Sequence, residues 1–217
     1  MRRMSRHQRD QHRVALLVPV KAFGVAKARL APVLSPDERA RLARWTAGRV
    51  IAAAGDMPVF ITCDDDEVAN WARSAGANVL WYPRAGLNAA MDFSVAELGR
   101  RAFDHVVIAH GDLPRAHELS SVATAGTITL VPDRRCDGTN VLAMPIDAAI
   151  NLSYGVQSFS RHLAAALRAG CAVEVRHDAL LSLDIDTPDD LTHPLVREVL
   201  PTWLPMNQAN HPSTIPY

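Results

Sequence analysis

The sequence predicts an α/β fold in which helices cover both faces of a mainly parallel sheet. Short runs rich in Val, Ile and Leu recur along the chain at lengths typical of buried strands. Segments with helical spacing of apolar residues separate several of these runs, and this β-α-β alternation is typical of parallel sheets. Ligands of such sheets bind at the carboxyl ends of the strands, so we expect every candidate site residue to follow a strand.

Seven segments have the composition of strands. Val, Ile and Leu are frequent in all of them, and each is shorter than an ordinary helix. Their predicted bounds are residues 14–20, 59–62, 78–81, 105–109, 127–131, 141–144 and 172–176.

The clearest helix signal begins at Ser35, with a proline directly after it and Glu38 three positions later. This pattern is a capping box, and proline suits the first position of a helix. Apolar residues then follow at near-helical spacing to about Ala54, and Gly55 ends the helix. Further helices are predicted over residues 67–74, 87–101 and 158–168.

Charge and composition exclude several classes of partner. The chain has 217 residues and equal numbers of Lys+Arg and Asp+Glu, 23 of each. Balanced charge gives no overall field that recruits nucleic acid or an anionic membrane, so neither is expected as a partner. No apolar run approaches the roughly 20 residues that cross a bilayer. The three cysteines lack CxxC spacing, which fits reduced thiols in the cytoplasm.

Residues 14–200 are expected to form one domain, because no repeat or linker divides them. We interpret the basic residues 1–13 as a disordered leader and the proline-rich residues 201–217 as a tail that wraps or frays. An apolar strand edge would support a homodimer.

The standard nucleotide fingerprints are missing, since no GxGxxG follows a strand and no GxxxxGK[ST] occurs. The first predicted strand instead leads into a loop that contains Lys21, Lys27 and Arg29. Three cations at the carboxyl end of a strand can hold a polyphosphate by charge, so we assign them to phosphate binding and catalysis. The alternative is an ordinary solvated basic loop.

Two aspartates have the placement expected of magnesium ligands. Asp112 directly follows a predicted strand, and Asp186 alternates with Asp184 in an extended acidic segment. Mg²⁺ prefers one or two carboxylates, with waters and phosphate completing its shell, so we predict Mg²⁺ on Asp112 and Asp186. The alternative for Asp112 is a helix N-cap. Asp189 and Asp190 fall in the first turn of a predicted helix and are interpreted as caps that suit its dipole.

Two further segments suit an anionic substrate. Thr139 lies in a turn before a strand, while Gly155 shortly precedes Ser158 at the start of a helix. Glycine lets the backbone approach a ligand, and a hydroxyl at a helix start suits phosphate or carboxylate. Ser158 as a plain N-cap is the alternative. His162, further along the same helix, has either a ligand-binding or a structural role.

Gly86 and Asn88 precede the third predicted helix, where an amide can read a base edge or a ribose. Met91 follows by about one turn and would line the same crevice, with a core position as the alternative. No residue pattern here identifies the base on its own.

Seven blocks, taken in order, resemble one family: the 2-phospho-L-lactate and phosphoenolpyruvate guanylyltransferases of deazaflavin coenzyme biosynthesis (CofC/FbiD). The blocks are Val18-Pro19-Val20-Lys21, Ala26-Lys27-Ala28-Arg29-Leu30, Gly86-Leu87-Asn88, Gly111-Asp112-Leu113-Pro114, Gly138-Thr139-Asn140, Gly155-x-x-Ser158-Phe159-x-x-His162 and Asp186-Thr187-Pro188-Asp189-Asp190-Leu191. Seven blocks in the right order are far more specific than any single one. Gly111, Tyr154 and Asp137 depart from the residues common in the family.

The resemblance implies a three-layer, Rossmann-like sandwich of the nucleotide-diphospho-sugar transferase type. It implies transfer of GMP from GTP to a phosphorylated three-carbon acid, with pyrophosphate released and Mg²⁺ held by Asp112 and Asp186. Thr139, Gly155 and Ser158 match the positions that hold the acid. The acid stays open between 2-phospho-L-lactate, phosphoenolpyruvate and 3-phospho-D-glycerate, and a downstream transferase that accepts the labile product is an expected partner.

Two other functions stay open on the sequence. A sibling nucleotidyltransferase would use the same metal chemistry on molybdopterin or a sugar phosphate. A non-catalytic nucleotide-binding regulator would keep the pocket but lose a metal carboxylate or a cation. The chain retains Lys21, Lys27, Asp112 and Asp186 together, which favours an enzyme.

Overall fold

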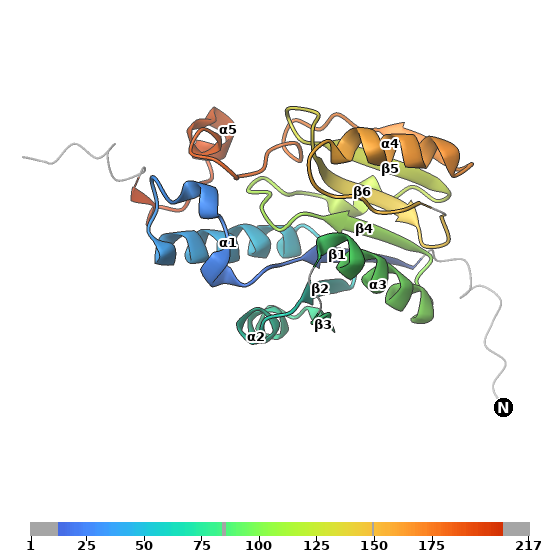
Figure 1. Ribbon diagram of the computed structural model, residues 1–217, viewed down its shortest axis with the longest axis horizontal. Helices are drawn as coiled ribbons and strands as arrows, with labels where there is room; N and C mark the ends of the chain where they lie inside the picture. The colour runs from blue at the N-terminus through green and yellow to red at the C-terminus, as the bar shows by residue number, and fades with distance from the viewer. Residues whose placement is uncertain (1–12, 84–85, 149, 206–217) are drawn as a thin grey trace, which may run out of the picture.

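The computed structural model describes residues 13–83, 86–148 and 150–205. Its centre is one seven-stranded sheet with the strand order β3-β2-β1-β4-β6-β5-β7 (Figure 1). The strands are β1 (Val14–Pro19), β2 (Val59–Cys63), β3 (Asn78–Trp81), β4 (His105–Ala109), β5 (Thr127–Pro132), β6 (Thr139–Pro145) and β7 (Ala172–Val175). All seven predicted strands are confirmed, and only β6 departs from its predicted bounds by more than one residue.

Most neighbouring strands run parallel, as predicted, but β6 is antiparallel to both β4 and β5. The amino end of β6 therefore lies at the same edge of the sheet as the carboxyl end of β4, where Val141 pairs with Ala109. The expectation that every site residue follows a strand is wrong at Thr139. That residue begins β6 and reaches the edge because its strand runs the other way.

The principal helices are α1 (Pro36–Ala52), α2 (Asp66–Ser74), α3 (Leu87–Arg100) and α4 (Ser158–Arg168), with a short α5 (Pro194–Arg197). The capping box of α1 is confirmed. Ser35 Oγ accepts a hydrogen bond from Glu38 N at 3.3 Å, and Glu38 Oε2 accepts one from Ser35 N at 2.8 Å. The helix ends two residues before the predicted Ala54, in a turn that leads to Gly55.

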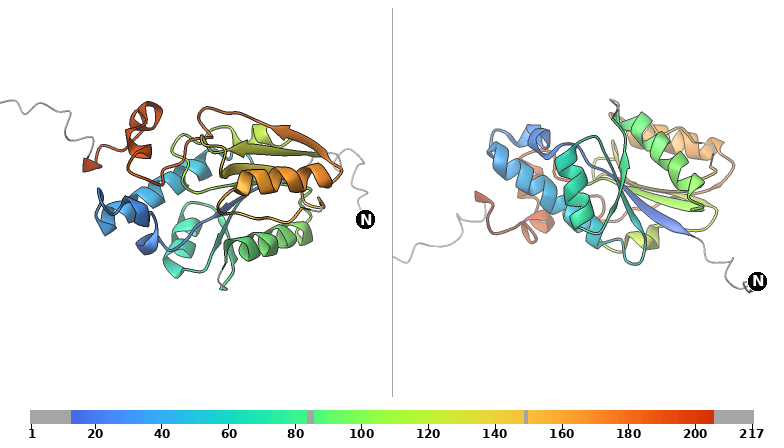
Figure 2. Two further views of the ribbon diagram at one scale, coloured as in Figure 1. Left: turned by 45° about the horizontal axis from the view of Figure 1, so that its top comes forward. Right: turned by 90° about the horizontal axis from the view of Figure 1, so that it is seen from below.

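The residues of β1 show how the three layers arise. Leu16 and Val18 belong to the apolar core shared with α1 and α2, while Ala15 and Leu17 belong to the core shared with α3 and α4. Side chains alternate along a strand, so both faces of this sheet are apolar and each requires cover. The two helix pairs supply it and produce the predicted three-layer sandwich (Figure 2).

A third apolar cluster attaches the C-terminal segment to the start of α1. Leu30, Leu42 and Ile185 pack there with Leu204. Of the predicted tail, only residues 201–205 are described, and Leu204 among them is fully buried. The predicted leader lies outside the described residues except for Arg13.

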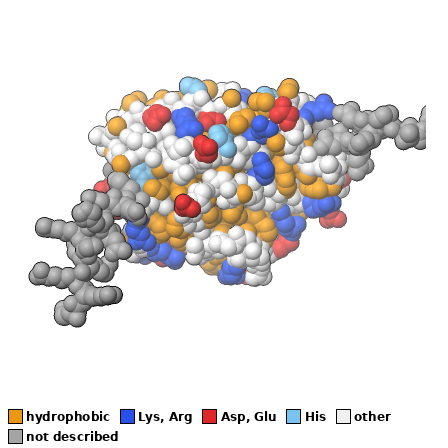
Figure 3. Space-filling view, turned by 180° about the vertical axis from the view of Figure 1, so that it is seen from behind, with side chains coloured by type: hydrophobic (Ala, Val, Ile, Leu, Met, Phe, Trp, Pro, Cys, Tyr) orange, Lys and Arg blue, Asp and Glu red, His pale blue; other side chains and the backbone are white. Residues whose placement is uncertain are grey.

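The surface agrees with the balanced charge of the chain. Acidic and basic side chains are interspersed on the face shown in Figure 3. Within the part of the chain that the structure describes, no helix combines the length and apolar character needed to span a membrane.

Candidate active site

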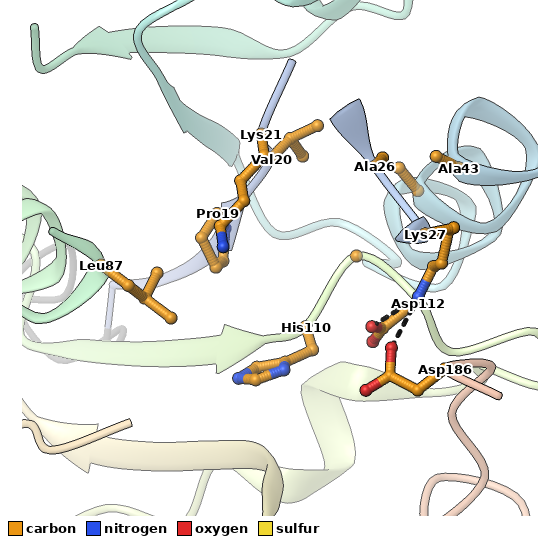
Figure 4. Close-up of a pocket in the computed structure, with 12 residues that line it drawn as sticks. Pro19, Val20, Lys21, Ala26, Lys27, Ala43, Leu87, His110, Asp112 and Asp186 are labelled. Carbon is orange, nitrogen blue, oxygen red and sulfur yellow. Dashed lines mark hydrogen bonds and ion pairs between the residues drawn. The ribbon is translucent and has the colours of Figure 1, made fainter. Parts of the chain in front are cut away.

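The carboxyl ends of β1 and β4 border a cavity of about 300 Å³. Four of the predicted site residues line it, namely Lys21, Lys27, Asp112 and Asp186 (Figure 4). The two lysines lie near Asp112 because β1 and β4 are parallel neighbours whose loops leave the sheet at one edge.

Lys27 lies between the two aspartates that the sequence assigned to a metal. Its Nζ is 2.8 Å from Asp112 Oδ2 and 3.2 Å from Asp186 Oδ1, and its side chain is 8% exposed. The backbone at Lys27 is left-handed, with φ of 56°. That conformation costs a non-glycine residue about 1 kcal/mol, and such strain is concentrated at functional sites.

The charges of this trio support one another. Burial opposes the charge on Lys27, but Asp112 and Asp186 outweigh it and raise the pKa of the ammonium above its ordinary value. Burial likewise opposes ionisation of Asp112, but Lys27 outweighs it and lowers the pKa of that carboxyl. Lys27 and Asp112 are therefore both charged near neutral pH.

Asp184 behaves differently from its neighbours. Burial, followed by the nearby charges of Asp112 and Asp186, raises the pKa of Asp184 to about 7. The sequence placed Asp184 beside Asp186 but gave it no separate role. Its environment could not be read from spacing, because its burial and the approach of Asp112 from a distant segment depend on the tertiary fold.

The donor set suits a magnesium ion that is shared with phosphate. Asp112 Oδ1 is buried and has no hydrogen-bond partner among the described residues, so one hard oxygen is available to a cation. Asp186 is 42% exposed and offers a second carboxylate. Within residues 13–83, 86–148 and 150–205, no group of three or more His, Cys, Asp or Glu could hold a metal by itself. A site of two carboxylates completed by waters and phosphate is what Mg²⁺ ordinarily takes.

The other two predicted cations differ in position. Lys21 lines the cavity and forms no ion pair with a carboxylate of the described residues. Arg29 is 76% exposed and lies 3.9 Å from Asp186 Oδ2, outside the lining of the cavity. The structure thus brings Lys21 and Lys27 to the cavity and leaves Arg29 at its rim.

Asp190 fixes the backbone that carries Asp186. Its Oδ2 accepts hydrogen bonds from Asp186 N at 3.0 Å and Thr187 N at 2.7 Å, while Arg134 donates to its Oδ1 at 2.6 Å. The predicted helix after this segment is only a 3₁₀ turn, Asp190–Thr192. Asp189 occupies the N-cap position of this turn but makes no side-chain capping hydrogen bond, and Asp190, in the first turn, is a buried brace for the backbone of residues 186–187.

A second cavity of about 100 Å³ adjoins the first on the side of β2 and β3, and Lys21 and Leu87 line both. Gly86 and Met91 also line it. Gly86 has φ of +113°, a conformation that favours glycine at the start of α3. Met91 is fully buried, so the crevice and core interpretations both describe it.

Asn88 uses its side-chain amide on the chain itself. Its Oδ1 accepts a hydrogen bond from Tyr154 N at 2.7 Å, and its Nδ2 donates to Tyr154 O at 3.3 Å. Both polar groups of the amide therefore have a backbone partner, and these contacts give no support to the predicted contact with a base or ribose.

The predicted acid-binding residues form a separate, buried cluster. Thr139 N donates to Ser158 Oγ at 3.1 Å, and both side chains are nearly inaccessible. Ser158 is the first residue of α4, and its hydroxyl accepts from Thr139 rather than from its own helix, so the plain N-cap alternative is wrong. Neither residue lines the 300 Å³ cavity, and Gly155 does not either.

His162 completes this cluster as a neutral side chain of fixed tautomer. Its Nε2 accepts a hydrogen bond from Ser153 N at 2.9 Å, so the ring proton resides on Nδ1 and is donated to Thr139 Oγ1 at 3.0 Å. Burial lowers the pKa of His162 to about 4, which keeps the imidazole neutral at pH 7.

Two residues to which the sequence assigned no role connect the cavity with this cluster. His110 lines the cavity, and its ring centroid is 5.1 Å from that of Tyr154. Tyr154 in turn packs edge-on against His162, with centroids 4.8 Å apart. Their position beside Asp112 and Gly155 in the sequence was the available signal, but the ring contacts depend on the tertiary fold.

Comparison with known sequences identifies relatives over most of the chain. The family model described as "Guanylyl transferase CofC like" matches residues 14–197. A phosphoenolpyruvate guanylyltransferase of Sphaerobacter thermophilus is 36% identical over 184 residues, which cover 81% of this chain and 89% of that protein. A 2-phospho-L-lactate guanylyltransferase of Methanothermobacter thermautotrophicus is 32% identical over 188 residues and covers 81% of each.

Solved structures share the fold at low sequence identity. A Desulfovibrio desulfuricans protein, proposed to be a nucleotide-diphospho-sugar transferase, matches with a TM-score of 0.70 and 16% identity over 91% of this chain and 94% of that one. CMP:2-keto-3-deoxy-manno-octonic acid synthetase, solved with CTP, matches with a TM-score of 0.54 and 15% identity over 87% of this chain and all of that one. These matches confirm the predicted nucleotide-diphospho-sugar transferase-like fold.

Proposed function

The chain belongs to the CofC-like guanylyl transferase family, and we propose from this premise that it transfers GMP from GTP to a phosphorylated three-carbon acid and releases pyrophosphate. The observation that carries the proposal is the trio of Lys27, Asp112 and Asp186 at the carboxyl edge of the sheet. It combines a charged phosphate-binding lysine with two carboxylates in a cavity that adjoins a second one, an arrangement that suits a nucleoside triphosphate.

The acceptor needs no general base in this reaction. A phosphate monoester has a second pKa near 6 and is largely dianionic at pH 7, so one of its oxygens can attack the α-phosphorus directly. The bond to pyrophosphate breaks as the new phosphoanhydride bond forms. The protein's contribution is then to align the two phosphates and to neutralise their charge.

The residues of the cavity divide this work. Asp112 and Asp186 would hold Mg²⁺, which supplies charge neutralisation at the phosphate oxygens when bound. Lys27 stays protonated and holds the two carboxylates together before substrate arrives. Lys21, which faces the cavity, binds the triphosphate, and Arg29 at the rim stabilises the departing pyrophosphate.

On the acceptor side, Thr139, Gly155 and Ser158 hold the acid, as the family resemblance implies. Phosphoenolpyruvate is the first acid to test, since the relative that is 36% identical is named for it. We place the reaction in deazaflavin coenzyme biosynthesis in the cytoplasm, where a downstream transferase accepts the labile product.

The decisive experiment measures pyrophosphate release with GTP, Mg²⁺ and one acid at a time: phosphoenolpyruvate, 2-phospho-L-lactate or 3-phospho-D-glycerate. A downstream transferase is included to trap the product. Release with one acid, lost in Asp186→Ala, supports the reaction and names its acceptor. No release with any of the three contradicts the proposal and favours a sibling enzyme that acts on molybdopterin or a sugar phosphate.

A further inference from the structure

Two helices hold Ser153 and Tyr154, the first two residues of the short loop formed by residues 153–155, through side chains, and a backbone turn in which Gly155 O accepts from Ser158 N at 3.0 Å joins the loop to α4. From α3, Asn88 binds both backbone groups of Tyr154, at 2.7 Å and 3.3 Å. From α4, His162 accepts the hydrogen bond of Ser153 N at 2.9 Å. Three hydrogen bonds from two different helices thus fix two consecutive residues.

The helix α4 side of this arrangement continues into the predicted acid-binding cluster. His162 also donates from Nδ1 to Thr139 Oγ1 at 3.0 Å, and Thr139 N donates to Ser158 Oγ. Because Nδ1–H is given to Thr139, the hydroxyl of Thr139 keeps its own proton for another acceptor. Gly155, the third predicted acid-binding residue, directly follows the two residues that are held.

The helix α3 side continues toward the predicted nucleotide-binding cavities. Leu87, adjacent to Asn88, lines both of them, and Gly86 lines the smaller one. The side chain of Asn88 nevertheless does not contact these cavities through its amide, since its oxygen and its nitrogen are both hydrogen-bonded to Tyr154. Gly86 and Leu87 at the start of α3 therefore border the cavities proposed for the nucleotide. The amide of Asn88 instead holds the loop that leads to Gly155.

We propose that Asn88 and His162 are positioning residues for the acceptor acid, acting as a clamp on residues 153–155. The clamp keeps Gly155 in place relative to Thr139 and Ser158, and it makes Asn88 a determinant of acid binding and not of base binding. This inference rests on the proposed function. It requires that loss of either side chain weakens binding of the acid while leaving binding of GTP unchanged.

The test compares Asn88→Ala and His162→Leu with the conservative variants Asn88→Asp and His162→Gln. GTP dissociation constants are measured by calorimetry without acid, and KM and kcat for phosphoenolpyruvate are measured with GTP saturating. Loss of two hydrogen bonds should raise the KM of the acid about tenfold or more, with kcat and the GTP dissociation constant changed less than about twofold. The conservative variants each keep a bonding atom and should recover much of the loss.

A matched control lies on the same helix. Ser94 of α3 is buried and bonds to Thr62 Oγ1 at 2.7 Å, away from the loop. Ser94→Ala should destabilise the helix packing but leave the KM of the acid unchanged. In the double variant Asn88→Ala/His162→Leu, the fold-increase in the KM of the acid should be smaller than the product of the two single increases, because both side chains act on one loop.

The proposal fails if Asn88→Ala raises the GTP dissociation constant and leaves the KM of the acid unchanged. That result would support the predicted contact of Asn88 with the base or ribose instead. Amide hydrogen exchange tests the clamp without any acid. Asn88→Ala should speed exchange at Tyr154 about tenfold, and His162→Leu should do so at Ser153. Unchanged exchange overturns the clamp, whereas faster exchange in an enzyme that uses none of the acids supports the clamp and removes only the proposed function.

Discussion

The two ends of the candidate site are held together by different forces. At one end, opposite charges join Lys27 to Asp112 and Asp186, one carboxylate oxygen has no partner among the described residues, and Asp186 is partly exposed. At the other, Thr139, Ser158 and His162 are neutral and buried, with hydrogen bonds between them. The charged end is open to a cation and phosphates, while the neutral end fixes shape.

This difference indicates how the effects of mutations should be distributed. Electrostatic preorganisation acts on charge that develops in the transition state, so changes at the charged end should lower the rate of reaction. Neutral hydrogen bonds within a buried cluster contribute mainly to stability and to the geometry of binding. The following predictions test that division, from the largest expected effect to the smallest.

Asp112→Asn should lower kcat by roughly 10²- to 10⁴-fold without unfolding the protein, because the amide keeps the size of the side chain and Lys27 keeps Asp186 as a partner, but the charge that holds Mg²⁺ is lost. Pyrophosphate release and thermal unfolding measure the two effects. Glu97→Gln is the matched control, since Glu97 pairs with Arg100 and Arg101 on the surface of α3. Near-normal turnover of Asp112→Asn at saturating Mg²⁺ would show that the metal assignment is wrong.

Lys27→Met should reduce the free energy of unfolding by about 3 kcal/mol, because it leaves two neighbouring carboxylates without their cation. The value is at the lower end for a broken ion pair, since Asp186 is 42% exposed and screened by solvent. Urea unfolding measures the loss. Added Mg²⁺ should stabilise Lys27→Met more than the wild type, as it can replace the missing charge. Equal stabilisation of both proteins would argue against a shared position for the lysine and the ion.

The neutral end should make the stability of the protein depend on pH. The pKa of His162 is about 4 in the folded chain and near 6.5 in an unfolded one, so the unfolded state binds the proton first. The stability that depends on neutral His162 is complete above pH 6.5 and is lost progressively as the pH falls toward 4, by about 3 kcal/mol in all.

Urea unfolding between pH 7 and pH 4 measures this loss, with His162→Gln as the reference because glutamine does not titrate. The variant should have a shallower dependence of stability on pH than the wild type over that window. Parallel curves would mean that His162 takes up its proton as readily in the folded chain as in the unfolded one, which would contradict the buried, neutral state assigned to it.

The sequence predicted the charged end better than the neutral end, for a physical reason. Lys21 and Asp112 come shortly after β1 and β4, Lys27 lies in the loop that follows β1, and parallel neighbours deliver such residues to a common edge whatever the details of packing. Asn88 was assigned to the nucleotide because an amide at the start of a helix can read a base edge or a ribose. Its contact with Tyr154 joins residues 66 positions apart and depends on how α3 packs, which no local pattern records.

The direction of β6 was also beyond the sequence. Its composition predicted a buried strand, but the alternation of side chains is the same in either direction. Asp190 shows the same limit, because its position suited a helix cap and only the approach of Arg134 from a distant turn made it a buried brace. Element type and bounds were local properties, and they were predicted well.

The reversed strand also has a consequence for how acceptor preference can change. The residues proposed to hold the acid, Thr139, Gly155 and Ser158, all lie between the start of β6 and the start of α4. The cations and carboxylates proposed for phosphate chemistry lie outside that stretch, at Lys21, Lys27, Asp112 and Asp186. The residues that would contact the acid can therefore change within one continuous segment, residues 139–158, while Asn88, which bonds to the backbone of Tyr154, and the residues proposed for phosphate chemistry stay the same. Exchange of that segment between relatives replaces one continuous stretch of chain and needs only two junctions.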